Sequence, residues 1–130
     1  MPVTIATIPQ IRMTRRIVGE YTMSTSDDKK VFEDSIGMIG NWKKRGPIYE
    51  VTFRALYSSK VRNLITAGRN ISANDAMWDV TRVIPACAVT GEAAGIAAAM
   101  TDDFTVLETK KLQSKLVQAG GVLHAAPCCF

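Results

Sequence analysis

Histidine and cysteine are scarce in this sequence, and their scarcity excludes two kinds of site. His124 is the one histidine, so no metal-ligand spacing exists and we predict no metal site. The three cysteines, Cys87, Cys128 and Cys129, are too few and too unevenly placed for a disulfide framework. Neither a metal centre nor a set of disulfides is therefore expected to hold the fold.

Long hydrophobic runs are absent as well. No apolar stretch is long enough to span a bilayer. The first residues, MPVTIATIPQ, lack the charged region followed by an apolar region that marks a secretory signal. We therefore expect a cytoplasmic protein with no membrane partner.

A large excess of one charge is also missing, because the formal net charge is only +4. The densest basic clusters lie at residues 12–16 and 43–45. Neither is interleaved with aromatic residues as a nucleic-acid-binding surface would be. We interpret both clusters as solvated basic surface and expect no nucleic-acid partner.

The remaining composition is that of a globular protein, and 130 residues suit one domain. Residues 7–23 mix β-branched and polar side chains and predict a strand, with Ile17, Gly19 and Tyr21 on one face. A weak strand that runs into a turn is expected over 35–47. A clearer strand is expected over 48–57. A short apolar strand, ended by Gly68, is expected over 63–68.

Three helices are expected. The first covers 24–35, where Thr25 and Asp28 have the spacing of a capping box. Residues 69–79 are expected to be a loop or a single helical turn. The second helix, built of small residues, begins at Pro85 or later, near Thr90. The third opens with a capping box over 105–108, buries a face containing Leu112 and Leu116, and ends at 120–121.

The second helix raises the main question, because residues 82–100 contain seven alanines and two glycines. Positions three and four apart share a helix face, so Gly91, Ala94, Gly95 and Ala98 form a stripe with almost no side chain. Tight packing on another helix or a sheet explains such a stripe, and we favour that explanation from the residues alone. A ligand held at the positive helix start is the alternative.

The order of motifs resembles a family of bacterial FAD-dependent oxidoreductases. NLITAGRNISA followed by TRVIPACAVTGEAAGIAAAM is similar to the carboxyl-terminal part of that family. RMTRRIVGEYTM, YEVTFRALYSSKVRNL and KLQSKLVQAGGVL are similar to its upstream and terminal segments, so the resemblance covers about residues 9–123. It implies an α+β fold with antiparallel cap or substrate strands over 1–60. A flavin-side strand and two helices follow over 61–123, and residues 124–130 form a tail.

The resemblance also implies FAD contacts. Ala67, Gly68 and Arg69 would approach the ribityl and pyrophosphate part of FAD, where a Cβ at Gly68 would obstruct the approach. Ser72 would contact the flavin or the phosphate. Arg82 would contact flavin or substrate, or else form a surface ion pair.

The small-residue helix is implied to serve the ring of the cofactor. Thr90, Gly91 and Glu92 would lie near the helix start, which would face the pyrimidine end of the isoalloxazine, where reduced flavin gathers negative charge. Ala94 and Gly95 would keep the helix close to the ring.

The arginine-rich segment of the family corresponds to Arg12, Arg15 and Arg16, one of which would bind an anionic substrate. For any single arginine, an ordinary ion pair with Glu20 or Glu50 is the interpretation that we favour. Trp78 stands where the family has a small residue, and would reshape the pocket or fill a gap. No catalytic acid, base or nucleophile can be named.

The family's amino-terminal G-x-G-x-x-G motif, which binds the ADP half of FAD, is not found in this sequence. We therefore expect weak FAD binding and little activity from the chain alone. We also expect an exposed apolar surface that self-associates or pairs with a separate chain carrying the missing half. A non-catalytic interaction domain is the main alternative. Thiol redox chemistry at Cys128 and Cys129 is another, although a tail with two incidental thiols is favoured.

Overall fold

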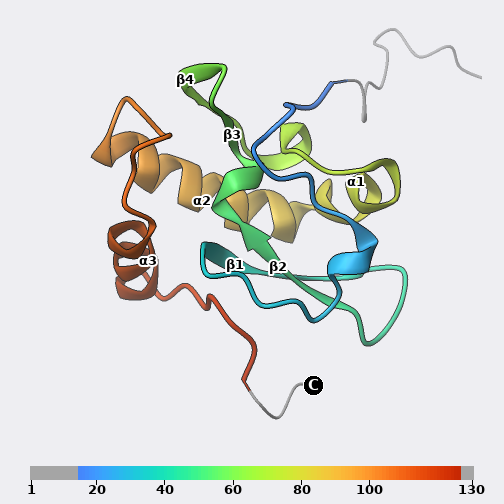
Figure 1. Ribbon diagram of the computed structural model, residues 1–130. Helices are drawn as coiled ribbons and strands as arrows, with labels where there is room; N and C mark the ends of the chain where they lie inside the picture. The colour runs from blue at the N-terminus through green and yellow to red at the C-terminus, as the bar shows by residue number, and fades with distance from the viewer. Residues whose placement is uncertain (1–14, 127–130) are drawn as a thin grey trace, which may run out of the picture.

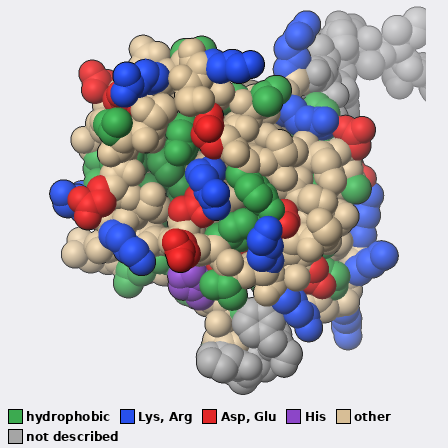
Figure 2. All heavy atoms as spheres, in the orientation of Figure 1, with side chains coloured by type: hydrophobic (Ala, Val, Ile, Leu, Met, Phe, Trp, Pro, Cys, Tyr) green, Lys and Arg blue, Asp and Glu red, His purple; other side chains and the backbone are tan. Residues whose placement is uncertain are grey.

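The computed structural model describes residues 15–126 (Figure 1), and Lys, Arg, Asp and Glu side chains are scattered over the face that Figure 2 shows. It confirms the α+β class, because two antiparallel hairpins precede the helices. The strands are β1 (Ser35–Gly40), β2 (Ile48–Thr52), β3 (Tyr57–Ser58) and β4 (Val61–Ile65). The helices are α1 (Asp75–Thr81), α2 (Ile84–Met100) and α3 (Thr109–Gln118), with single 3-10 turns η1 (Thr25–Asp27), η2 (Phe53–Ala55) and η3 (Gly68–Asn70).

The β1–β2 hairpin is covered on both sides. β1 pairs antiparallel with β2, so that Met38 lies opposite Glu50. Helix α2 crosses behind the hairpin, and the chain after α3 returns along β1, where the Ser35 hydroxyl donates to the Leu123 carbonyl at 2.6 Å (Figure 1). Glu50 is consequently buried, and its two carboxylate oxygens bind the Phe32 N–H at 2.8 Å and His124 Nδ1 at 2.9 Å.

Helix α2 begins at the earlier of the two predicted positions, with Pro85 in its first turn. Its buried residues are Ala86, Thr90, Ala93, Ala94 and Ala97. Strand β1 comes very close to α2 at Gly37, where an added Cβ would lie only 2.6 Å from Val89 Cγ1 in the helix. Close packing therefore explains one face of the helix. The buried face of the helix is not the predicted one, however, because Gly91, Gly95 and Ala98 are exposed.

Larger side chains supply most of the apolar area of the core. Met23, Phe53, Leu56, Ile71 and Met77 are fully buried between the hairpins and α2. Because an alanine-rich helix face buries little area for each residue, these side chains carry more of the hydrophobic stabilisation. The core draws residues from both the predicted strand region and the predicted flavin-side region.

Helix α3 ends as predicted but begins later. Leu112 and Leu116 are buried, and the helix stops in a Schellman arrangement, where Gly120 has a φ of +95° and the Gly121 N–H donates to the Leu116 carbonyl at 2.8 Å. The capping box predicted over 105–108 is wrong. The Thr105 hydroxyl instead binds the Asp103 carboxylate at 2.6 Å, and the helix starts at Thr109 without a side-chain cap.

Two predicted elements of the amino-terminal region are wrong. Residues 15–22 form no ladder, because their N–H groups reach carbonyls of different segments, as Ile17 does at Asn70 (2.8 Å) and Tyr21 at Arg54 (3.1 Å). The chain also bends at Glu20 and Tyr21. The part of this segment before residue 15 lies outside the described residues. The helix predicted over 24–35 is only η1, and its capping box joins Ser24 to Asp27, one residue before the predicted box.

Helix α1 lies mostly within residues 69–79, for which the sequence predicts a loop or a single helical turn. Asn74 caps it by accepting the Met77 N–H at 2.9 Å. Across residues 15–126 no single helix is both long and apolar enough to cross a bilayer. Only α1 and α2 taken together, across their 86° bend, satisfy that test of length and composition.

Candidate functional site

The segment that follows β4 is tied directly to α2. The Gly68 N–H donates to the Thr90 hydroxyl at 2.9 Å, and that hydroxyl lies 2.8 Å from the Ala86 carbonyl, to which it donates. Gly68 has a φ of +67°, a conformation that glycine adopts without strain, and a Cβ there would lie 3.3 Å from Cys87 Sγ. The predicted residues Ala67, Gly68 and Arg69 therefore lie against the first half of α2.

Thr90, Gly91 and Glu92 do not lie at the start of α2, so this part of the prediction is wrong. The helix begins at Ile84, and its N-cap residue Val83 provides no side-chain hydrogen bond. Thr90 is 1% exposed and sits well inside the helix, where its hydroxyl joins the helix to Gly68. The sequence left the start of the helix open between Pro85 and a later position near Thr90, and the structure shows Pro85 in the first turn.

The outer face of α2 is open. An added Cβ at Gly91 or Gly95 would meet no atom within 4 Å. Glu92 is exposed beside them, whereas Ala94 is buried. A flat group or a second helix can therefore approach the backbone along Gly91 and Gly95 more closely than larger side chains would allow.

Ser72 and Arg82 have internal partners. Ser72 is buried, and its hydroxyl lies 3.0 Å from the Thr22 hydroxyl, so this hydroxyl has a partner within the chain. Arg82 Nε donates to the Asp79 carboxylate at 2.9 Å, the surface ion pair that had been the alternative. Both residues hold segments of the chain together.

The arginine segment lies beside η3. Arg16 stacks 4.6 Å from the centroid of the Trp78 ring and pairs with Asp75 at 2.9 Å, rather than with Glu20 or Glu50. The Trp78 indole N–H donates to the Arg69 carbonyl at 2.7 Å, so Trp78 fills the space between the arginine segment and η3. Arg15 is exposed, and Arg12 lies outside the described residues.

Two shallow depressions share these arginines. Arg15 and Arg16 line one with Asp75 and Trp78, and they line the other with Ile17, Leu64, Thr66 and Asn70. The structure thus brings the predicted substrate arginines next to the predicted Ala67–Arg69 segment, although the two lie about fifty residues apart in the sequence.

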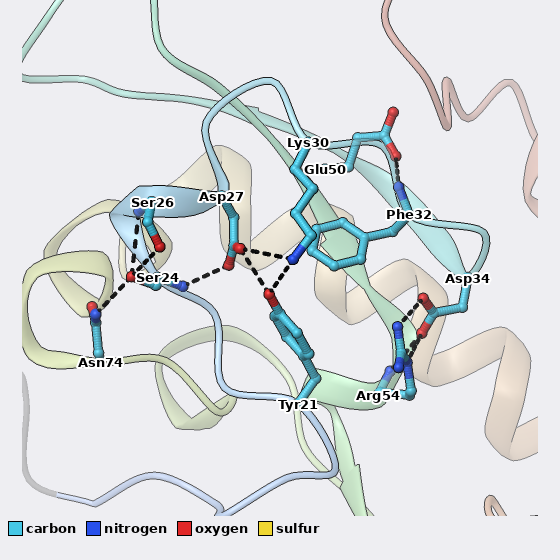
Figure 3. Close-up of polar contacts among 10 residues, drawn as sticks. All are labelled: Tyr21, Ser24, Ser26, Asp27, Lys30, Phe32, Asp34, Glu50, Arg54 and Asn74. Atoms are coloured by element: carbon cyan, nitrogen blue, oxygen red, sulfur yellow. Dashed lines mark hydrogen bonds and ion pairs between the residues drawn. The ribbon is translucent and has the colours of Figure 1, made fainter.

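A cluster that the sequence did not predict lies on the other side of residues 15–24 (Figure 3). The Tyr21 hydroxyl donates to Asp27 at 2.7 Å and accepts from Lys30 Nζ at 2.9 Å. The hydrogen bond to Tyr21 is the main reason that the pKa of Lys30 is raised. Asp27 is buried, so the cluster places one buried carboxylate behind a tyrosine and an exposed cation.

The second half of this cluster is the pair of Asp34 and Arg54 (Figure 3). Arg54 binds both carboxylate oxygens, with Nε at 3.0 Å and Nη2 at 3.1 Å, and the Thr52 hydroxyl also donates to Asp34. Burial alone would raise the pKa of Asp34, but these hydrogen bonds outweigh burial and lower it. The β1–β2 register brings the two residues together, a contact that no local pattern signals.

Comparison with known families adds one finding. A family model described as FAD dependent oxidoreductase matches residues 2–119. The chain belongs to the FAD-dependent oxidoreductase family. The resemblance in the sequence motifs is thereby confirmed at the level of the family. No curated protein and no solved structure gives a significant match.

Two features of α2 in this family member are compatible with the flavin half of FAD. Gly91 and Gly95 leave the backbone of α2 open, and the first turn of α2 has no side-chain cap from Val83, so its positive end is available to negative charge. The ADP half has no corresponding G-x-G-x-x-G motif in this sequence. Within the described part of the chain, no group of three His, Cys, Asp or Glu side chains is placed to hold a metal ion.

Proposed function

We propose that this chain supplies the isoalloxazine side of an FAD site in an oxidoreductase. The observation that carries the proposal is the hydrogen bond between Gly68 and Thr90, which holds the Ala67–Arg69 segment against the first half of α2. The open strip along Gly91 and Gly95 lies on the same helix. Membership in the family supports FAD as the cofactor.

The placement of the predicted residues separates two roles. Ala67, Gly68 and Arg69 retain exposed surface and, with Gly91 and Gly95, are the residues that would touch the cofactor. Ser72, Thr90 and Arg82 are engaged by internal hydrogen bonds. We assign those three to positioning the segments around the site, and we assign Ala94 to packing beneath the open strip.

FAD supplies two-electron oxidation and reduction when it is bound. The chain itself supplies shape and charge. The uncapped start of α2 at Ile84 favours negative charge, and the strip of small residues excludes water by close contact rather than by bulky side chains. Arg15 and Arg16 would hold an anionic group of the substrate beside η3, since both line depressions there.

The site needs a further protein surface, because the motif for the ADP half is not found in this sequence. Exposed apolar side chains favour such a partner: Ile84 at the start of α2 is 85% exposed, and Val61 and Leu64 on β4 are also exposed. We propose as the partner either a second copy of this chain, which would cover the apolar surface without supplying the motif, or a separate chain that carries the dinucleotide-binding motif. The chain alone is proposed to be inactive as an enzyme.

The test is a visible absorption spectrum of the purified chain after incubation with FAD and gel filtration. A retained band near ~450 nm, in fractions larger than a monomer by light scattering, supports the proposal. A colourless protein that still self-associates supports the alternative function, an interaction domain that keeps the fold without the cofactor. A colourless monomer contradicts both.

A further inference from the structure

The loop that joins β1 to β2 is the most basic exposed surface of the hairpin. Its sequence from residue 41 to 47 is NWKKRGP, so three consecutive cations follow an aromatic residue. Trp42 is 55% exposed, and Lys43, Lys44 and Arg45 are exposed with it. Lys43 Nζ lies 5.3 Å from the centroid of the Trp42 ring, so the cationic and aromatic surfaces adjoin.

The loop is held in one shape by its own bonds and by α1. The Asn41 N–H donates to the Pro47 carbonyl at 3.1 Å, and the Lys43 N–H donates to the Asn41 side chain at 2.9 Å. The Trp42 indole N–H donates to the Asp79 carbonyl at 2.9 Å. Because folding already orders the backbone of this loop, little backbone entropy remains to be lost when a ligand binds.

Acidic groups near the loop neutralise only part of its charge. The Asp79 carboxylate binds both Lys43 and Arg82, and these hydrogen bonds lower its pKa, so it is ionised at neutral pH. Asp28 accepts the Ile48 N–H at the base of the loop at 2.9 Å. Among residues 15–126, Lys44 and Arg45 form no ion pair with a carboxylate. Their charges are therefore available to an anion.

These residues surround a concavity. It has a volume of about 510 Å³ and is lined by residues 40–48, with Trp42, Lys44 and Arg45 among them. Small-molecule sites commonly occupy about 300–1,000 Å³. The concavity combines two uncompensated cations with an exposed indole, and phosphate groups and aromatic bases are the groups that such side chains recognise.

We propose that the β1–β2 loop binds a nucleoside diphosphate. Lys44 and Arg45 hold the two phosphates, and the Trp42 ring stacks on the base. The concavity is lined by residues 40–48 of the hairpin alone, so it is independent of the surface along Gly68 and Gly91. It assigns a role to the basic cluster at residues 43–45, which the sequence had suggested to be solvated surface only.

The test is a titration of the full chain with ADP at physiological salt, followed by two-dimensional ¹H–¹⁵N NMR. The protein has two indole N–H signals, from Trp42 and Trp78, and the Trp42→Phe variant identifies which is which. The proposal predicts saturable shifts of the Trp42 indole and of the backbone of Lys44 and Arg45. The Trp78 indole signal should not move.

A charge-matched pair of variants separates a site from general attraction. Lys44→Gln with Arg45→Gln should weaken ADP binding by about tenfold or more, because charge-assisted bonds to phosphate are lost. Lys110→Gln with Lys115→Gln removes the same charge from exposed positions of α3 and should leave the affinity unchanged. Equal loss in both variants, or no saturable shift at Trp42, overturns the proposal.

Three further ligands decide the chemical class. Inorganic pyrophosphate should bind more weakly than ADP, and adenosine should not bind measurably, if phosphates and base are both recognised. Vesicles with anionic phospholipids should bind no better than neutral vesicles. Binding of the anionic vesicles that exceeds binding of ADP would overturn the proposal in favour of a membrane-surface contact.

Discussion

The Gly68 N–H donates a 2.9 Å hydrogen bond to the hydroxyl of Thr90. The hydroxyl in turn donates to the Ala86 carbonyl within α2, so one buried side chain joins the helix to the turn after β4. This bond fixes where the Ala67–Arg69 segment lies relative to the open strip on α2. The proposed cofactor surface depends on it.

Thr90→Val should therefore destabilise the fold. Valine keeps the shape of threonine but leaves the Gly68 N–H without its acceptor, which costs about 1–3 kcal/mol in the free energy of unfolding. Thr90→Ser keeps the hydroxyl and should lose less. Urea unfolding at 25 °C measures both variants. A valine variant as stable as the wild type would show that the bond contributes nothing to the fold.

Two glycine substitutions should have opposite signs. Gly95→Ala, on the open face of α2, should raise the free energy of unfolding by about 0.5–1 kcal/mol because alanine is the better helix former. Gly37→Ala should lower it by about 1–3 kcal/mol because the new Cβ would overlap Val89. Thermal unfolding of the two variants checks the contrast. The same sign for both would contradict the description of the two faces.

Asp34 should make the free energy of unfolding depend on pH in the acidic range. Its pKa is lowered in the fold, so its contribution is fully present above its unfolded pKa near 3.9 and is lost as the pH falls through the folded pKa. Below pH 4 the wild type should lose stability more steeply than Asp34→Asn, and the variant should be the less stable at pH 7. Asp102→Asn, at an exposed position, is the control and should follow the wild type.

Arg16 should matter little for folding. Its pair with Asp75 is on the surface, where Asp75 is 93% exposed, and its stacking on Trp78 is partly solvated, so Arg16→Gln should cost less than about 1 kcal/mol. The Trp78 fluorescence should nevertheless change, because the guanidinium leaves the ring. A loss of several kcal/mol in urea unfolding would show that Arg16 is a structural residue and would remove the reason to propose it as a substrate contact.

Local signals in the sequence predicted part of the fold. Pro85 marked the start of α2 and Gly120 marked the end of α3, because proline and glycine act on the backbone at their own positions. The predicted alternation is also seen over 17–22, where half-buried and exposed residues alternate. Residues 15–22 do not form a strand. A ladder needs one neighbouring segment that presents its carbonyls in register, whereas the N–H groups of residues 15–22 bond to several different segments.

The candidate site was less predictable. The sequence did not predict the contact between Gly68 and α2. Thr90 could not be oriented from the sequence, since the same threonine suits a helix start and a buried position inside a helix. The pair of Asp34 and Arg54 was missed because the β1–β2 register creates it. Contacts of this kind depend on pairing between strands and leave no local pattern.

The central claim is that the open strip of α2 receives the flavin, and a titration of FAD with the purified chain, followed by flavin fluorescence, tests it most directly. The account predicts weak, saturable binding that Gly95→Leu reduces by about tenfold or more by blocking the approach to the helix. Ser114→Leu, which also places a leucine at an exposed position of a helix, in α3, should leave the affinity unchanged. FAD that fails to bind the wild type, or that binds Gly95→Leu equally well, would contradict the account.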